Sequence, residues 1–347
     1  MTQGFKKDFF SKSEIKWNSD IQKTDLDKIN SIVKNNINSD NFLLERNSGM
    51  EINSNNFRLS FNSRKFILKR WSKKIQISKI NKILEIITWL NKKKVKTPIA
   101  KQFKNKKKII KYKNEYWSYF DYIEGNHFKG EINEMRDVAN NLGKFSNQLK
   151  KYSIKKINKR YRYYTKDDAN VLKFLKKNSH NLNNFFSKKH SLLIEKNLPE
   201  IMRLFNNLKK KKLSNKSHII HMDIHPHNII TKNGKLKAFI DIDSCVVGDV
   251  SQSLSYAALK ICKQTFIFNK KKENIKNIKM YFLNEIKKTY KYKQINEDNF
   301  YFFAISEVIR RLIEMFRFTI KNNNKRWNHV IPIQIDHLNE CKAIFKK

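Results

Sequence analysis

The first third of the chain alternates short apolar runs with turn residues. Asn47-Ser48-Gly49 and Asn62-Ser63 separate the first runs, a pattern that predicts antiparallel strands. Between the third and the fourth run, Ile77–Leu90 carries apolar residues at the 3.6-residue period and predicts an amphipathic helix. The predicted strands are Phe42–Arg46, Asn56–Phe61, Lys65–Trp71, Ile109–Tyr112 and Tyr116–Ile123.

Beyond residue 131 the apolar residues follow the helical period over most of the chain. Met135–Leu149 and Leu193–Leu208 are examples, and most of the last hundred residues have the same pattern. The pattern therefore predicts an α+β chain, with a small antiparallel sheet in its first part and a larger, mostly helical second part.

The stretch from His218 to Asp243, HIIHMDIHPHNIITKNGKLKAFIDID, combines polar groups with a hairpin. Asp223 and Asn228 lie five residues apart in a loop. Asn233-Gly234 supplies a two-residue turn, and the return arm ends in Asp241 and Asp243. The hairpin is expected to fold Asp241 back close to Asn228. Phosphoryl transfer from ATP needs such a layout, with a carboxylate to orient the attacking hydroxyl and an Asn and an Asp to hold Mg²⁺.

HMDIHPHN followed by FIDID resembles the catalytic-loop and metal-site motifs of the aminoglycoside phosphotransferase and choline kinase family. The family pattern is roughly His-Gly-Asp, four residues, Asn, and an apolar strand ending Ile-Asp-x-Asp/Glu; here Met222 replaces the Gly. The resemblance implies a two-lobed protein-kinase-like fold. Residues 1–123 would form the nucleotide-binding lobe, with 1–40 as a lead-in, and residues 124–347 the catalytic and substrate-binding lobe.

The resemblance also implies an ATP- and Mg²⁺-dependent kinase that phosphorylates a hydroxyl of a small molecule. The acceptor would be a sugar or amino sugar, an amino alcohol such as choline, or an aminoglycoside. Asp223 is then the catalytic carboxylate, and Asn228 and Asp241 are the metal ligands, because Mg²⁺ combines few protein oxygens with phosphates and water. A protein kinase would show Arg in place of Met222 and Gly in place of Asp243, and it would carry an Ala-Pro-Glu motif, which is missing here.

Nucleotide binding is expected from the strand-rich part. Strand alternation places Lys69 on one face with Ile67, and Lys69 occupies the position of the nucleotide-binding lysine of kinase-like folds. Glu85, the sole carboxylate of its predicted helix, is expected to hold Lys69 toward the phosphates. The other expected nucleotide-binding residues are Ser48 and Gly49 in a phosphate-covering loop, and the main chain near Phe120 and Tyr122.

Several side chains are candidates for acceptor binding. These are His225, His227, Asp243 and Glu307. An acidic rim formed by Asp243, Asp167, Asp168 and Glu307 would favour a cationic acceptor, whereas a sugar is an equal alternative. Asp167 has a second interpretation as the cap of a following helix.

The formal net charge of +43 raises a nucleic-acid alternative. Only 12 of the 74 basic residues are Arg, the preferred side chain for bidentate phosphate recognition, and Lys is spread along the chain beside abundant Asn and Ile. This distribution favours compositional bias. Nucleic acid is therefore not expected as a partner, although a basic RNA-binding or non-catalytic protein stays the alternative from another class.

A second alternative is a metal-dependent hydrolase. HMDIHPH offers His221, Asp223, His225 and His227 to a transition metal, but this interpretation leaves Asn228 unexplained. The three cysteines show no paired spacing, and the chain carries neither an 18-residue apolar stretch nor a signal-like start. We therefore expect a cytoplasmic protein without a membrane span, as a monomer or homodimer.

Overall fold

The computed structural model describes residues 5–7, 12–37, 39, 41–47, 55–153, 165–210, 218–269, 272–291, 295, 297–325 and 327–346. The chain forms two compact units. The β unit comprises Lys12–Lys129 and Pro226–Cys245, and the helical unit comprises Met1–Ser11, Gly130–His225 and Val246–Lys347. Residues 226–245 thus group with the strand-rich part of the chain. The predicted lobe boundary at residues 123–124, which would place them with the helices, stays a prediction.

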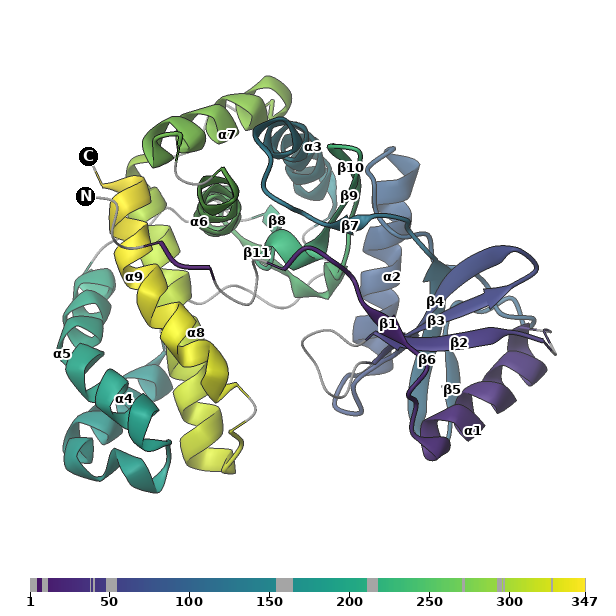
Figure 1. Ribbon diagram of the computed structural model, residues 1–347, viewed down its shortest axis with the longest axis horizontal. Helices are drawn as coiled ribbons and strands as arrows, with labels where there is room; N and C mark the ends of the chain where they lie inside the picture. Colours follow the sequence, from purple (N-terminus) through teal and green to yellow (C-terminus); the bar gives the residue numbers. More distant parts are fainter. Residues whose placement is uncertain are drawn as a thin grey trace. The chain divides into compact units, whose positions relative to one another are not determined.

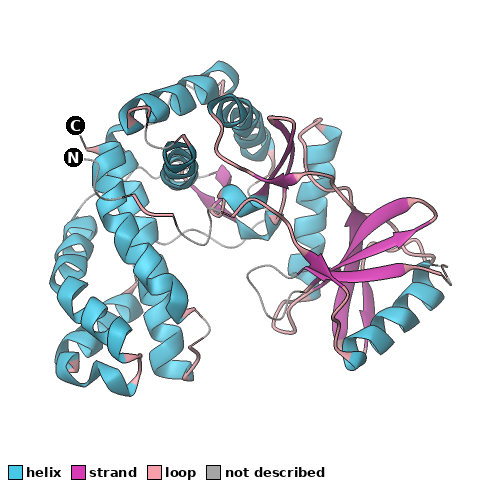
Figure 2. Ribbon diagram, viewed as in Figure 1, coloured by secondary structure: helices cyan, strands magenta, loops and turns pink. Residues whose placement is uncertain are grey.

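The β unit contains a sheet of antiparallel neighbours in the order β1-β2-β3-β4-β6-β5, drawn in magenta in Figure 2. Two helices accompany it, α1 (Lys23–Ile32), which runs into a π-helical turn at Val33–Ile37, and α2 (Ile77–Lys92). All five predicted strands and the predicted amphipathic helix are confirmed, with shifts of one or two residues at their ends. The strands are β1 (Trp17–Asn18), β2 (Leu43–Asn47), β3 (Asn56–Phe61), β4 (Arg64–Arg70), β5 (Ile110–Tyr112) and β6 (Glu115–Asp121).

Two-residue turns with positive φ join neighbouring strands. Asn62-Ser63 joins β3 to β4, and Lys113-Asn114 joins β5 to β6, with φ between 45° and 62° at these four residues. Turns with both central residues in the left-handed region match the right-handed twist of the paired strands, and Asn tolerates this conformation better than most residues do.

The two faces of the sheet have different partners. Phe57, Leu59, Phe66 and Leu68 form one core with Ile29 and other residues of α1. Because side chains alternate across a strand, Ile67 and Lys69 of β4 lie on the opposite face, as the sequence predicts. The sheet therefore directs Lys69 away from this core.

A second, smaller sheet of the β unit has the order β10-β9-β7, formed by β7 (Asn126–His127), β9 (Ile229–Lys232) and β10 (Lys235–Phe239). The predicted hairpin is confirmed, and its turn residues Asn233 and Gly234 have φ of 52° and 68°. Lys96, just after α2, supplies a carbonyl to the N–H of Phe239 at 2.9 Å. This bond holds the last residue of β10, two residues before Asp241, beside Lys96.

The helical unit surrounds α6 (Figure 1). Every residue from Val250 to Phe266 of this helix is buried, as expected for a central helix covered on all sides, and α3, α7, α8 and α9 pack against it. Asp249 caps α6 by accepting from the N–H of Ser251 at 2.8 Å. The helices of this unit are α3 (Ile132–Lys151), α4 (Lys166–Lys177), α5 (Lys188–Lys210), α6 (Val250–Phe268), α7 (Ile275–Thr289), α8 (Phe300–Asn322) and α9 (Ile331–Phe345).

Two short strands, β8 (His218–His221) and β11 (Cys245–Gly248), pair with each other, and β8 packs against α3 and α6.

One local prediction, the cap of α4, was wrong. Thr165, not Asp167, caps α4, because its hydroxyl accepts from the N–H of Asp168 while the Asp168 carboxylate accepts from the N–H of Thr165. The predicted α+β class, with an antiparallel sheet and a larger helical part, is confirmed.

Candidate functional site

The hairpin brings Asn228 and Asp241 together in the β unit. Asn228 ends a one-turn 3₁₀ helix, and its carbonyl accepts from the N–H of Ile240 at 2.9 Å. The strand register pairs Ile229 with Phe239, so that Asp241 follows directly after the last paired residues. The antiparallel pairing thus places the backbone of Asn228 next to that of Asp241, although the two residues are thirteen positions apart in the sequence.

Asp241 has a left-handed backbone conformation, with φ of 59° and ψ of 52°. Few residues other than Gly adopt it, although Asp and Asn do so more often than most, and such positions concentrate at functional sites. The turn directs the chain into a short 3₁₀ helix at Ile242–Ser244, which carries Asp243 and packs against α2.

Lys69 makes ion pairs with both acidic residues of this turn. Its Nζ lies 2.9 Å from Asp241 Oδ1 and 3.4 Å from Asp243 Oδ2. The same ammonium lies 4.6 Å from the ring centroid of Trp71, which adds a cation–π contact. Lys69 of β4 is therefore held by two carboxylates that follow the hairpin and lie 172 and 174 residues further along the chain.

The ionisation of this cluster follows from burial and mutual charge. Burial opposes a charge on Lys69, but the Asp241 and Asp243 carboxylates outweigh it and raise the pKa of the ammonium above its usual value. For Asp241, Lys69 lowers the pKa, while desolvation and the neighbouring Asp243 carboxylate raise it; the balance is a pKa above the usual range. The Lys69 ammonium thus stays positively charged, and the side chains of Asp241 and Asp243 share this single charge.

Glu85 lies on the exposed side of α2. In the described part of the chain, the carboxylates that pair with Lys69 are Asp241 and Asp243, and Glu85 is not among them. Its predicted role in holding Lys69 stays a prediction.

The main chain near the predicted adenine site takes part in the sheet. The N–H of Asp121 donates to the carbonyl of Ile99 at 3.1 Å, and the N–H of Tyr122 donates to Lys65 at 3.1 Å. Phe120 is buried within β6. Adenine binding by backbone groups near Phe120 and Tyr122 therefore also stays a prediction. Ser48 and Gly49, predicted to cover the phosphates, lie outside the described residues.

Asp223 belongs to the helical unit, where β8 leads into it. Its N–H donates to Nδ1 of the buried His221 at 3.2 Å, and the carbonyl of His221 accepts from the Ser253 hydroxyl of α6 at 2.5 Å. His221 therefore anchors the backbone of the loop and connects it to the central helix.

The Asp223 carboxylate faces two basic side chains. Arg311 of α8 donates to Asp223 Oδ1 at 2.8 Å, and His225 Nε2 lies 3.6 Å from Asp223 Oδ2. Burial favours the neutral acid, but Arg311 first, and then His225, outweigh it and hold the pKa of Asp223 well below its usual range. Asp223 is consequently an ionised carboxylate at neutral pH.

The remaining candidates for acceptor binding have defined surroundings. His227, in the β unit, is bonded through Nε2 to the carbonyl oxygen of Lys12 at 2.8 Å and stacks on His127. Glu307 is 0% exposed and accepts from Arg310 and Arg311. Direct contact of Glu307 with an acceptor stays a prediction that this fully enclosed position does not favour.

From the sequence, Arg311 is one of three charged residues of its helix, with Glu307 and Arg310, that could face a substrate cleft or form an exposed polar stripe; the sequence gives it no role toward Asp223. The spacing Glu307, Arg310, Arg311 on one helix indicates ion pairs, since residues three and four apart are neighbours on a helix. The contact of Arg311 with Asp223, 88 residues earlier, has no counterpart in that pattern.

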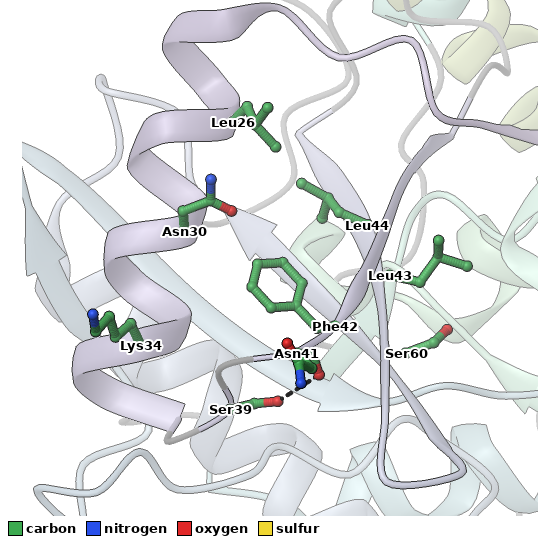
Figure 3. A pocket seen from close by; sticks show the side chains of 9 residues that line it. All are labelled: Leu26, Asn30, Lys34, Ser39, Asn41, Phe42, Leu43, Leu44 and Ser60. Atoms are coloured by element: carbon green, nitrogen blue, oxygen red, sulfur yellow. Dashed lines mark hydrogen bonds between the residues drawn. The ribbon is translucent and has the colours of Figure 1, made fainter.

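Figure 3 shows a pocket on a different part of the β unit, between α1 and the start of β2. Its lining includes the apolar side chains of Leu26, Phe42 and Leu43, with Lys34 as its charged residue, and none of the candidate site residues contributes to it. The pocket therefore does not mark the chemistry described above.

A transition-metal centre at HMDIHPH finds no support. Among the described residues, no group of three or more His, Cys, Asp or Glu side chains is arranged to hold a metal ion.

No helix among the described residues combines the length and the apolar character needed to cross a membrane.

Comparison with known proteins gives a family and a fold. The family model described as "Phosphotransferase enzyme family" matches residues 44–267. A search of curated proteins finds no match.

Among solved structures, a spectinomycin phosphotransferase in complex with ADP and spectinomycin aligns with a TM-score of 0.69 at 14% identity, covering 94% of this chain and 99% of that chain. An amicoumacin kinase in complex with AMP-PNP, Ca²⁺ and Ami aligns with a TM-score of 0.60 at 11% identity, covering 85% of this chain and 89% of that chain. A microcompartment-associated aminopropanol kinase gives 0.60 at 11%, covering 91% and 95%. At these identities the likeness shows the fold.

Proposed function

Because the chain belongs to the phosphotransferase enzyme family, we propose that it transfers the γ-phosphoryl group of ATP to a hydroxyl group of a small molecule. Family membership confirms the predicted phosphotransferase, and neither the RNA-binding nor the hydrolase alternative gains support. The proposed chemistry is supported by the hairpin, which brings the backbone of Asn228 next to that of Ile240 and Asp241, and by an Asp223 that Arg311 holds ionised.

Asn228 and Asp241 fit a divalent cation of the Mg²⁺ type. One offers a neutral amide oxygen and the other a carboxylate oxygen, from adjacent backbone, and Mg²⁺ accepts few protein oxygens when phosphates and water complete its shell. The ion would neutralise charge on the phosphates when bound. Lys69, whose ammonium stays protonated, supplies a second positive charge from the same cluster.

Asp223 would orient the acceptor hydroxyl and receive its proton. In the balanced reaction, the hydroxyl oxygen forms a bond to the γ-phosphorus, the bond to the β,γ-bridging oxygen breaks, and ADP leaves. Since the transition state is loose and the proton moves late, a low pKa is compatible with this role, because positioning contributes more than base strength.

The surroundings of the acidic side chains support a neutral, hydroxyl-rich acceptor over a polycation. Glu307 pairs with Arg310 and Arg311, Asp168 pairs with Arg317, and Asp243 pairs with Lys69. Three of the four carboxylates of the predicted acidic rim thus already form ion pairs with basic side chains. Sugars therefore come first in an acceptor screen, followed by amino alcohols and aminoglycosides.

We also propose the reducing cytosol as the compartment. Cys245, Cys262 and Cys341 are all free thiols, and the last two are buried. Thiols persist in this state where glutathione and thioredoxin keep them reduced.

The test of the proposed function is Asp223→Asn, assayed by ADP release with a panel of sugars, amino alcohols and aminoglycosides. We expect kcat to fall by at least about 100-fold, the usual contribution of a positioned proton acceptor, because Asn cannot accept the proton. The rise in melting temperature caused by ATP and Mg²⁺ should persist. Asp298→Asn, at an exposed position of the helical unit, is the matched control. Retention of kcat within about threefold in Asp223→Asn would remove Asp223 from the mechanism.

A further inference from the structure

We propose that Arg311 of α8 is a positioning residue that holds the carboxylate of Asp223 in place for the acceptor hydroxyl. The inference rests on the proposed function, since it concerns how the carboxylate of that reaction is held. Family membership and the two sequence motifs do not assign Arg311 any role.

The Arg311 guanidinium binds the loop at two points. Nη2 donates to Asp223 Oδ1 at 2.8 Å and to the carbonyl oxygen of Met222 at 3.1 Å. One planar group therefore fixes both the side chain of Asp223 and the backbone immediately before it. Arg is suited to this task because its donors lie in a rigid fork, which a Lys ammonium cannot reproduce.

Arg311 itself is held from two sides. Its Nε donates to Glu307 Oε1 at 2.7 Å, and its guanidinium carbon lies 4.4 Å from the ring centroid of Tyr256 on α6. Glu307 is in turn fixed by Arg310, whose Nε and Nη2 donate to the two carboxylate oxygens at 2.9 and 2.8 Å. Because Glu307 is 0% exposed, a carboxylate without a partner would be a costly buried charge, and the ion pairs with Arg310 and Arg311 compensate for it.

This arrangement distinguishes the two oxygens of Asp223. Oδ1 is used by Arg311, while Oδ2 faces His225 Nε2 at 3.6 Å. A general base must present an oxygen to the acceptor hydroxyl, and the contacts with Arg311 and His225, one at each oxygen, limit the rotation of the carboxylate. The geometry follows the logic of a base that is oriented by a third group.

The same contacts set the ionisation of Asp223. The charged and titratable groups around it are Arg311, Glu307 and Arg310 of α8, Tyr256 of α6, and His225 and His221 of its own loop. Arg311 makes the largest favourable contribution to the ionised form. Loss of Arg311 must therefore raise the pKa of Asp223, and the acid limb of the kcat profile should move to higher pH.

The experiment compares Arg311→Gln and Arg311→Lys with the full-length wild type, each also in the Asp223→Asn background. For Arg311→Gln we expect kcat to fall by about 10- to 100-fold, KM for ATP to change by less than about threefold, and the acid limb to rise by about one pH unit or more. Arg311→Lys should retain more kcat and a smaller pH shift, because the charge remains but the fork is lost.

The double variants separate positioning from a general structural role. If Arg311 acts through Asp223, Arg311→Gln should lower kcat by less than about threefold once Asp223 is Asn, since the group that it positions has been removed. Arg317→Lys on the same helix is the control, because Arg317 pairs with Asp168. In this variant the acid limb should not move, and kcat should change by less than about twofold.

Two results would overturn the inference. One is an unchanged acid limb in both Arg311 variants; the other is an equal fold-loss in the presence and absence of Asp223. ATP-induced thermal stabilisation verifies that each variant is folded, and if Arg311→Gln fails this check, Arg311→Lys alone decides through its pH profile. Full kcat in Asp223→Asn would instead remove Asp223 from the mechanism, and a wild type without acceptor-dependent ADP release would refute the proposed function, so these failures are distinguishable from failure of the Arg311 inference.

Discussion

Among individual residues, burial acts on two ionisable groups of the helical unit with opposite outcomes. Asp223 is charged because Arg311 and His225 compensate for its desolvation. His218, at the start of β8, is 7% exposed, and its Nε2 has no hydrogen-bond partner among the described residues. Burial, assisted by Lys150, lowers the pKa of His218 to about 4. A charged group thus needs a partner in this unit, whereas an unpartnered group becomes neutral.

His218 makes stability depend on pH. Between pH 6.5 and 4 the unfolded chain binds a proton at this site and the folded chain does not, so the free energy of unfolding should decrease on acidification. The contribution is about 1.4 kcal/mol per pH unit, or roughly 3 kcal/mol over the window. His218→Leu should remove this share of the pH dependence, which urea unfolding at pH 7, 5.5 and 4.5 would measure.

His180→Leu is the control for this prediction, because the His180 side chain is 90% exposed. Its pH dependence should match that of the wild type. Equal slopes of unfolding free energy against pH in His218→Leu and the wild type would contradict the assignment to His218.

At the scale of elements, the small sheet of β7, β9 and β10 determines where Asn228 and Asp241 lie. Gly125, directly before β7, has φ of 147°, and a Cβ at this position would lie 2.3 Å from the carbonyl oxygen of Thr231 in β9. Both the backbone conformation and the close approach require glycine. Gly234, in the β9–β10 turn, has φ of 68° but nothing within 4 Å of such a Cβ.

These two glycines give a paired prediction. Gly125→Ala should lower the free energy of unfolding by about 2–3 kcal/mol, because the left-handed strain adds to a backbone clash. Gly234→Asn should cost less than about 1 kcal/mol, since Asn tolerates φ near 60° and meets no neighbour. Urea denaturation of both variants would test this. A Gly125→Ala protein as stable as Gly234→Asn would show that β7 can move away from β9 at little cost.

The sequence predicts elements well where the controlling forces are local. Asn233-Gly234 predicts the hairpin, and alternation in β4 predicts the face that carries Lys69, because turn propensity and side-chain period are properties of adjacent residues. The interpretation of Asp167 as the cap of α4 fails because Thr165 also has a cap-forming side chain, and the reciprocal bonds between Thr165 and Asp168 decide in favour of Thr165.

Contacts between distant segments could not be predicted in this way. Lys69 pairs with Asp241 across 172 residues and Arg311 with Asp223 across 88, and in each case many other basic residues carry the same charge. The left-handed backbone of Asp241 likewise results from the end of the hairpin and the following turn, and has no residue-type signal comparable to glycine.

For the whole molecule, the outstanding property is the formal charge of +43. Such a field attracts any polyanion at long range, but salt screens it, with a Debye length of about 10 Å at 0.1 M. Specific nucleotide binding, by contrast, depends on short contacts such as those that Lys69 and Asp241 can offer. Ionic strength therefore separates an enzyme with a lysine-rich surface from an RNA-binding protein.

We expect binding of a single-stranded poly-U RNA to weaken steeply between 50 and 300 mM KCl and to disappear at the upper end, because each released counterion adds to the salt dependence. Over the same range, kcat with a neutral sugar acceptor should stay constant, and KM for ATP–Mg²⁺ should rise by no more than about fivefold through lost steering. Fluorescence anisotropy and the coupled assay would supply the two measurements. RNA affinity that persists at 300 mM KCl would show that part of the charge forms a specific nucleic-acid surface, because non-specific attraction of lysines to phosphates cannot survive such screening.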